Sequence, residues 1–370
     1  MNEDFLYKKL DERKGQNAYR QLYLPDGKID FSSNDYLGVA KNALIPEKLT
    51  TGFKHGATGS RLLSGNYALI AETEKFIAAF HNADAGLIFN SGYDANTGLL
   101  SCVPQRGDTI VYDRLSHASI RDGIRLSFAQ SFSFMHNSMT DLEEKLRIAK
   151  GNIFVVTETV FSMEGDMAPI SEIAALCEKY NAYLIVDEAH ATGVIGNRGE
   201  GLIQELGLQK KCFARMHTFG KAVGCHGAIV LGSEALRNYL INFSRSFMYT
   251  TALPEISVSA IRASYEIFPM LRKERNHLLQ LIHGFHAEAS KLFTLRPGIE
   301  VLKSSAPIQA IVVPGNDNVR KLSQQLAEAN LDIRPILYPT VPRGRERLRI
   351  VLHSFNSMEE LNRLINFSKV

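Results

Sequence analysis

Short apolar runs alternate with helical segments along much of the chain, and this alternation constrains the fold more than any other feature. The run YLIV at residues 183–186 has no polar alternation, which is typical of a strand covered on both faces. Similar runs begin at Ala85, Thr109 and Ile153, and each is followed by a segment with helical spacing. The pattern predicts an α/β fold, with a mostly parallel central sheet and helices on both of its faces.

We expect three segments along the chain. Residues 1–40 are predicted to form an N-terminal helix and a hairpin, because an amphipathic stretch precedes a Pro25-Asp26-Gly27 turn signal. Residues 41–254 carry the strand–helix alternation and are predicted to form the large domain. From residue 255 long helices and then further strands follow, which predicts a smaller α+β domain over residues 255–370.

The composition and charge of the chain exclude several classes of partner. A net charge of +3, without a stripe of basic residues, does not indicate nucleic acid. No apolar run approaches a membrane span, and the charged N-terminus lacks the apolar core of a signal peptide. The four cysteines show no metal-ligand spacing and are typical of reduced thiols. We therefore expect a cytoplasmic protein with no nucleic-acid partner, no membrane partner and no metal.

Three polar residues are expected at the ends of two strands. Asp187 follows the strand at residues 183–186, His190 comes three residues later, and Lys221 follows a second run at residues 214–218. The carboxyl ends of parallel strands meet at one edge of a sheet, where ligands bind. A lysine can form a Schiff base with pyridoxal phosphate, and an acidic residue can keep its pyridine nitrogen protonated. Each residue alone is more often a cap or solvated surface, but the combination indicates pyridoxal phosphate.

Other residues could contribute to the same site. Ser91 and Gly92 open a helix after a buried strand, which is a good seat for a phosphate. His117 lies near a strand end at a helix start, where contact with a ligand and a capping role are equally compatible with the pattern. Arg347 and Arg349 alternate on the last strand and face one way. Arginine is suited to clamp a carboxylate, although an exposed strand arginine is the alternative.

Two other α/β classes are excluded by missing motifs. The letters DEAH at residues 187–190 also name a helicase box, but the chain has no G-x-x-x-x-G-K-[ST] phosphate loop. It also lacks a G-x-G-x-x-G motif after its first strand, so a dinucleotide-binding fold is not predicted.

Seven segments in order make nearly the whole chain resemble the α-oxoamine synthases. These are fold-type I pyridoxal phosphate enzymes that condense an amino acid with an acyl thioester. The matching segments are FSSNDYLG, SGY, DRLSHAS, VFSMEGD, VDEAHATGVIG, TFGKAVG and RLRI.

The resemblance implies catalytic roles for four residues. Lys221 would carry the cofactor and abstract the α-proton of the amino acid. Asp187 would pair with the pyridine nitrogen, His190 would bond the phenolic oxygen, and His117 would stack on the ring.

The resemblance also implies binding positions. Contacts to the cofactor are expected from Gly92, Tyr93, Ser162 and Thr218. Thr251 would reach the cofactor of a partner subunit, which implies a homodimer with shared active sites. Asn34 and Arg349 match positions near the substrate, with Arg349 holding the amino-acid carboxylate.

The C-terminal segment resembles one branch of the family. A Pro-Thr-Val-Pro run at residues 339–342 is similar to the biotin-pathway members, which condense L-alanine with pimeloyl-CoA or a pimeloyl-acyl carrier protein. Sister synthases that use glycine or serine are the alternative, and a catalytically silent protein of the same fold is another. The segment LHSFNS departs from the family, because Asn356 stands where relatives often carry a histidine and His353 lies nearby.

Overall fold

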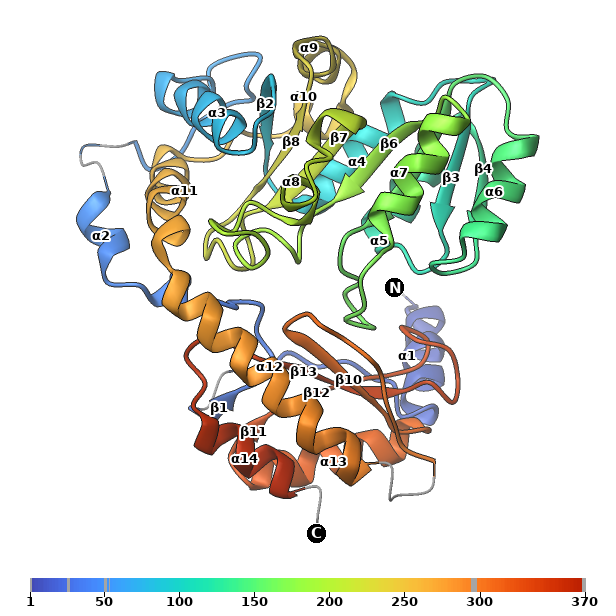
Figure 1. Ribbon diagram of the computed structural model, residues 1–370, viewed down its shortest axis with the longest axis vertical. Helices are drawn as coiled ribbons and strands as arrows, with labels where there is room; N and C mark the ends of the chain where they lie inside the picture. Colours follow the sequence, from blue (N-terminus) through green and yellow to red (C-terminus); the bar gives the residue numbers. More distant parts are fainter. Residues whose placement is uncertain (1, 25–26, 50–51, 53, 294–297, 368–370) are drawn as a thin grey trace. The chain divides into compact units, whose positions relative to one another are not determined.

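The structure is a computed structural model that describes residues 2–24, 27–49, 52, 54–293 and 298–367. These residues form two compact units (Figure 1). Unit 1 contains Met1–Ser33, Met163–Asp166 and Asn276–Val370, and unit 2 contains Asn34–Ser162 and Met167–Arg275.

Unit 2 holds the larger set of elements. Its helices are η1 (Val39–Lys41), α2 (Leu44–Lys48), α3 (Ala68–Phe80), α4 (Gly92–Cys102), α5 (Ala118–Leu126), α6 (Met139–Ile148), α7 (Ile170–Lys179), α8 (Leu202–Glu205), η2 (Gln209–Lys211), α9 (Glu234–Phe243), α10 (Arg245–Met248), α11 (Glu255–Ile267) and η3 (Phe268–Met270). Its strands are β2 (Ala85–Phe89), β3 (Thr109–Asp113), β4 (Gln130–Phe134), β5 (Ile153–Glu158), β6 (Tyr183–Asp187), β7 (Cys212–Thr218) and β8 (Ala228–Gly232).

The strands of unit 2 form one sheet in the order β2-β8-β7-β6-β5-β3-β4. Strand β8 is antiparallel to both of its neighbours, and the other strand pairs are parallel. The predicted mostly parallel sheet is therefore confirmed.

The central strands of this sheet are buried on both faces, because successive residues point to opposite sides and helices pack on each side. Phe154 and Ile185 join a core that includes residues of α4, α5, α9 and α10. Val155 and Val186 join a second core that includes residues of α6, α7 and α8. Burial on both faces explains why the strands read as continuous apolar runs. Figure 1 shows helices on both faces of the sheet.

Unit 1 is an α+β body. Its elements are α1 (Asp4–Gly15), β1 (Ile29–Asp30), β9 (Glu300–Val301), β10 (Ile308–Val312), α13 (Asn316–Glu328), β11 (Leu331–Asp332), β12 (Arg334–Ile336), β13 (Arg347–Val351) and α14 (Met358–Phe367). A long helix, α12 (Arg272–Phe293), begins in unit 2 and continues into unit 1. Strands β12, β13, β10 and β9 form an antiparallel sheet in that order, and α13 packs on its β12 side.

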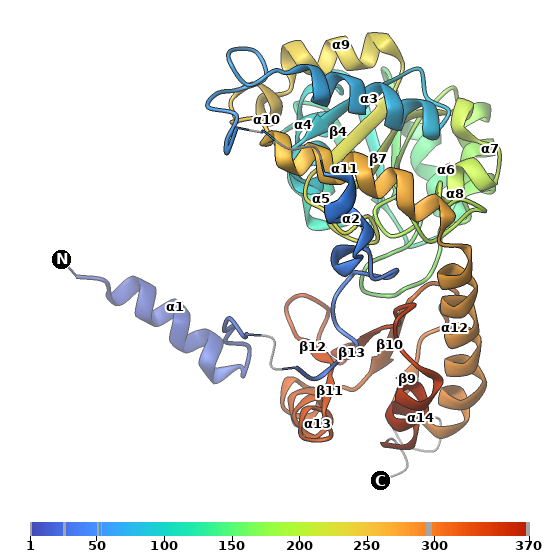
Figure 2. The same ribbon diagram turned by 90° about the vertical axis from the view of Figure 1, so that its left-hand side faces the viewer.

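The predicted N-terminal hairpin is wrong. Strand β1 pairs in parallel with β11, about three hundred positions later in the chain, and residues 22–24 form no strand in the described structure. Pro25 and Asp26 of the expected turn lie outside the described residues. Turn residues report local backbone preference, whereas the partner of a strand depends on the whole fold. Helix α1 forms where it was expected, but none of its described residues is buried, and Figure 2 shows it extending away from the strands of unit 1.

Candidate active site

The candidate site lies at the carboxyl edge of the large sheet. Asp187 is the last residue of β6, and β7 runs parallel beside it with Asp187 opposite Met216. Thr218 therefore ends β7 at the same edge, and Lys221 follows three residues later. On the other side of β6, Asp187 stands opposite Glu158, the last residue of β5. The sheet thus brings together two carboxyl groups and a lysine that lie far apart in sequence.

The Asp187 carboxylate is buried and held by two donors. The side-chain amide of Asn96 on α4 donates to Oδ2 at 2.8 Å, and the backbone N–H of Ala189 donates to Oδ1 at 2.8 Å. Asp187 faces the same side of the sheet as Ile185, where α4 and α5 pack, because alternate residues share a face. Two hydrogen bonds fix the orientation of the carboxylate and leave lone pairs for a further donor.

Lys221 contacts His190 directly. Lys221 Nζ lies 2.7 Å from His190 Nε2, and His190 Nδ1 lies 2.5 Å from the hydroxyl of Tyr36. The Tyr36 hydroxyl also donates to Asn34 Oδ1 at 3.2 Å. A continuous series of contacts therefore runs from the amine of Lys221 through His190 and Tyr36 to Asn34. These four side chains come from three separate motifs.

Glycines bring the backbones of these motifs close together. Gly193 has a φ of +83°, and a Cβ there would lie 2.7 Å from the Cβ of Ala222, next to Lys221. Gly224 has a φ of +68°, and a Cβ there would lie 2.4 Å from the backbone nitrogen of Ala40. Both positions require glycine, because a side chain would meet a neighbour and the backbone is left-handed. These contacts explain Gly193 in VDEAHATG and Gly224, the second glycine of TFGKAVG.

His117 is the N-cap of α5, and its Nδ1 accepts from the backbone N–H of Ser119 at 3.2 Å. The backbone N–H of His117 donates to Glu158 Oε1 at 2.6 Å. His117 thus serves as a helix cap in the structure. Contact of its ring with a ligand stays a prediction. The Glu158 carboxyl ties the loop that carries His117 to the end of β5.

Two of these groups have shifted pKa values. Loss of solvation lowers the pKa of His117; the Asp187 carboxylate opposes this shift, and the Lys221 ammonium adds to it. Burial raises the pKa of Glu158 well above its ordinary value, and the Asp187 charge raises it further. The His117 N–H and Lys221 oppose that shift. Asp187 and Lys221 therefore lie within electrostatic range of both His117 and Glu158. Two adjacent buried carboxyls resist double ionisation, and the raised pKa of Glu158 favours its protonated form.

The remaining predicted cofactor contacts lie at defined places in unit 2. Gly92 and Tyr93 begin α4 behind an N-cap at Ser91, in the turn where helix geometry leaves backbone N–H groups without intrahelical partners. Thr218 lies beside Gly92, since its Oγ1 would be 3.5 Å from a Cβ at that glycine. Ser162 is half-buried in the turn after β5. Thr251 is exposed, and its carbonyl accepts from the side chain of Asn90 at 2.7 Å.

This set of groups fits pyridoxal phosphate. A partly buried lysine amine suits a Schiff base, and a buried carboxylate suits a protonated pyridine nitrogen. The start of α4 offers N–H groups and the positive end of a helix dipole to a phosphate. Among the described residues, no cluster of His, Cys, Asp or Glu could hold a metal ion.

The predicted carboxylate clamp lies in unit 1. Arg349 is half-buried in β13, opposite Ala310 and Arg334. Arg347, two residues earlier, is buried and paired with Glu164 at 2.9 Å. The charge of Arg347 is therefore neutralised within unit 1, and the carboxylate contact expected of Arg349 stays a prediction.

The departure from the family pattern has a structural explanation. His353 is buried, with Nε2 3.1 Å from the hydroxyl of Ser33 and Nδ1 3.1 Å from Asn356 Oδ1. Asn356 also donates to the carbonyl of Asp30 at 3.2 Å. His353 and Asn356 therefore join the end of β13 to β1 and to the segment after it, which includes Ser33.

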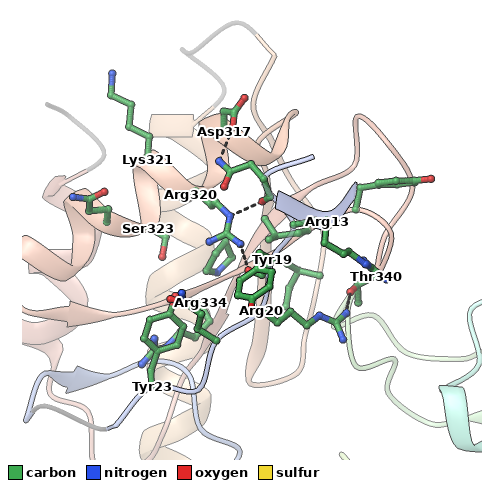
Figure 3. A pocket seen from close by; sticks show the side chains of 18 of the residues that line it. Arg13, Tyr19, Arg20, Tyr23, Asp317, Arg320, Lys321, Ser323, Arg334 and Thr340 are labelled. Carbon is green, nitrogen blue, oxygen red and sulfur yellow. Dashed lines mark hydrogen bonds between the residues drawn. The ribbon is translucent and has the colours of Figure 1, made fainter. Parts of the chain in front are cut away.

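Unit 1 also contains a cationic cavity of about 930 Å³ between the N-terminal segment and α13 (Figure 3). Five cationic side chains line it among the described residues, against one carboxylate, Asp317. The cations are Arg13, Arg20, Arg320, Lys321 and Arg334. Arg20 donates to the hydroxyl of Thr340, which belongs to the Pro-Thr-Val-Pro run, at 2.9 Å.

Sequence reasoning missed three residues of this site. Tyr36 lies inside the FSSNDYLG motif, so that motif was the available signal for it. Glu158 directly follows an apolar strand run, as Asp187 does, and could have been found by the same rule. Asn96 is an ordinary helix residue in the sequence, and only its contact with Asp187 reveals its role.

No helix among the described residues combines the length and apolarity needed to cross a membrane. A model of the aminotransferase class I and II family matches residues 26–367. The chain is 42% identical to an 8-amino-7-oxononanoate synthase of Emericella nidulans, over 98% of this chain and 94% of that protein.

Two solved structures share the type I fold of pyridoxal phosphate-dependent transferases with this chain. An 8-amino-7-oxononanoate synthase from Francisella tularensis is 30% identical, with a TM-score of 0.80 over 93% of this chain and 98% of that one. A serine palmitoyltransferase from Sphingomonas wittichii is 26% identical, with a TM-score of 0.89 over 99% and 96%. The chain therefore belongs to the aminotransferase class I and II family, and within it to the α-oxoamine synthases that include the 8-amino-7-oxononanoate synthases.

Proposed function

We propose that the protein condenses L-alanine with a pimeloyl thioester, carried by CoA or by an acyl carrier protein, in biotin biosynthesis. The products are 8-amino-7-oxononanoate, CO₂ and the free thiol, and the cofactor is pyridoxal 5′-phosphate. The observation that carries the proposal is the shared sheet edge of Lys221 and Asp187, in a chain 42% identical to a synthase of that name.

The cofactor, when bound, accepts the negative charge that develops at the α-carbon of alanine. Asp187 favours this by holding a proton at the pyridine nitrogen, since its carboxylate is buried and kept in place by Asn96. Lys221 removes the α-proton from alanine, and His190 orients its amine through the 2.7 Å contact. The first N–H groups of α4, at Gly92 and Tyr93, hold the phosphate. His117, Ser162 and Thr218 complete the cofactor contacts.

The bond changes follow from the substrates. The α-carbon of alanine forms a bond to the thioester carbonyl carbon, and the carbon–sulfur bond breaks to release the thiol. The alanine carboxylate then leaves as CO₂, and a proton returned to the α-carbon by Lys221 or water completes the product. Arg349 binds the alanine carboxylate before it leaves, as a planar guanidinium does well, and Asn34 helps to position the substrate.

We extend the proposal to assembly and location. Thr251 is exposed in the single chain and adjoins the start of α4 through Asn90, so it is available to a partner subunit. This supports a homodimer in which each subunit contributes to the other's site. The four free cysteines support a cytoplasmic location.

The test is product identification by mass spectrometry. Purified protein with pyridoxal phosphate and pimeloyl-CoA is incubated separately with alanine, glycine and serine. Alanine should give 8-amino-7-oxononanoate and CO₂. A product from glycine or serine alone would instead assign the protein to a sister synthase. The absence of any product with either pimeloyl-CoA or a pimeloyl-acyl carrier protein would refute the activity.

A further inference from the structure

We propose that Tyr36 is a positioning residue for the catalytic lysine. Its buried hydroxyl fixes the proton of His190 on Nδ1, so that Nε2 offers a lone pair to Lys221. The inference rests on the proposed function for the importance of Lys221, but the geometry that supports it is independent of the substrate.

The contacts form a continuous path whose two central residues are buried, while Lys221 and Asn34 at its ends are half-buried. Tyr36 is fully buried, and His190 is 4% exposed. The Tyr36 hydroxyl lies 2.5 Å from His190 Nδ1 and 3.2 Å from Asn34 Oδ1, and His190 Nε2 lies 2.7 Å from Lys221 Nζ. The polar atoms of the two buried residues, Tyr36 and His190, are stabilised only if each donor faces an acceptor.

With Lys221 charged and His190 neutral, one arrangement of protons gives each of these three contacts a donor and an acceptor. The Lys221 ammonium can only donate, so His190 Nε2 must accept. A neutral imidazole has a single N–H, which then sits on Nδ1 and donates to the oxygen of Tyr36. The Tyr36 O–H is left to donate to the amide oxygen of Asn34. Donors and acceptors then match from Lys221 to Asn34.

The opposite tautomer disrupts the path at both ends. With the proton on Nε2, two donors face each other between His190 and an ammonium on Lys221. The Tyr36 hydroxyl would then donate to Nδ1, and its bond to Asn34 would be lost. The second ring nitrogen of a functional histidine commonly decides which tautomer it adopts, and here that nitrogen meets Tyr36.

Tyr36→Phe tests the inference, because it removes one oxygen and keeps the ring. Histidine ¹⁵N resonances of the full-length, cofactor-free protein report the tautomer directly, and His190→Gln identifies the His190 signals. We expect the wild type to hold the proton on Nδ1 and Tyr36→Phe to show a mixture of tautomers or the Nε2 form. With the cofactor bound, the variant should lose about tenfold in kcat, with a shifted pH profile and little change in KM for alanine.

Tyr265→Phe is the matched control. Tyr265 is also fully buried in unit 2, and its hydroxyl lies 3.1 Å from Nε2 of another histidine, His81. This control should leave the His190 signals and the pH profile as they are in the wild type. A similar shift of the His190 signals in both variants would show a general packing effect and overturn the inference.

Two further outcomes are decisive. If Tyr36→Phe folds and keeps the His190 tautomer and the pH profile of the wild type, Tyr36 only fills the core. If Tyr36→Phe does not fold, Asn34→Ala removes the acceptor at the end of the path while keeping Tyr36, and it must still change the tautomer. Because the resonances are read without substrate, failure here is distinguishable from failure of the proposed reaction.

Discussion

Glu158→Gln should change the pH dependence of stability in a way that reveals the proton on Glu158. The side chain is 3% exposed, and its pKa is raised well above the ordinary value by burial and by Asp187. Glutamine is nearly isosteric, stays neutral, and keeps an oxygen that can accept from the His117 N–H. The substitution therefore removes the titration and preserves the contact.

The sign and the size of this effect on stability follow from the linkage between protonation and folding. In the unfolded chain Glu158 ionises near pH 4.3, whereas in the folded chain it stays protonated to a much higher pH. Its contribution to stability is fully present below the unfolded pKa and is lost as pH rises toward the folded pKa. The slope is about 1.4 kcal/mol for each pH unit. Relative to Glu158→Gln, the wild type should therefore lose stability as pH rises from the unfolded pKa toward the raised folded pKa, by at most about 1.4 kcal/mol for each pH unit.

The assay is urea unfolding of cofactor-free protein followed by circular dichroism at several pH values. Glu188→Gln is the control, because burial raises the pKa of the fully buried Glu188 to about 7. Its difference from the wild type should level off above that pH, while the difference for Glu158→Gln continues to grow. If the stabilities of wild type and Glu158→Gln run parallel from about pH 5.5 to 8, Glu158 is ionised in the folded chain and the reasoning is wrong.

Three further predictions concern the cofactor and the core. Lys221→Ala should fold as the wild type does by circular dichroism and lose at least a hundredfold in turnover, since the proposed proton acceptor is gone; near-normal turnover would exclude that role. Asp187→Asn should still bind the cofactor by absorbance titration but lose about a hundredfold or more in kcat, and an unchanged kcat would contradict its electrostatic role. Leu99→Ala should destabilise the protein by about 2–5 kcal/mol in urea unfolding, because Leu99 is fully buried on the inner face of α4; a loss below about 1 kcal/mol would show that the core refills the space.

Local patterns were sufficient for the parts of this protein that depend on burial. Residues 183–186 read as a strand covered on both faces because they are one, with Ile185 in one core and Val186 in the other. The placement of Asp187 and Lys221 at one sheet edge followed from that, since parallel strands share their carboxyl ends. Ordered motifs then identified the family.

Only the tertiary structure decided which side chains hydrogen-bond to one another and which strands pair. Tyr36 meets His190 across 154 positions, Asn96 meets Asp187 across 91, and β1 pairs with a strand far along the chain rather than with its neighbour. The raised pKa of Glu158 likewise depends on the register that sets it opposite Asp187. The physical reason is that periodicity records how deeply a residue is buried, whereas a hydrogen bond or a pKa depends on which particular atoms surround it once the chain has folded.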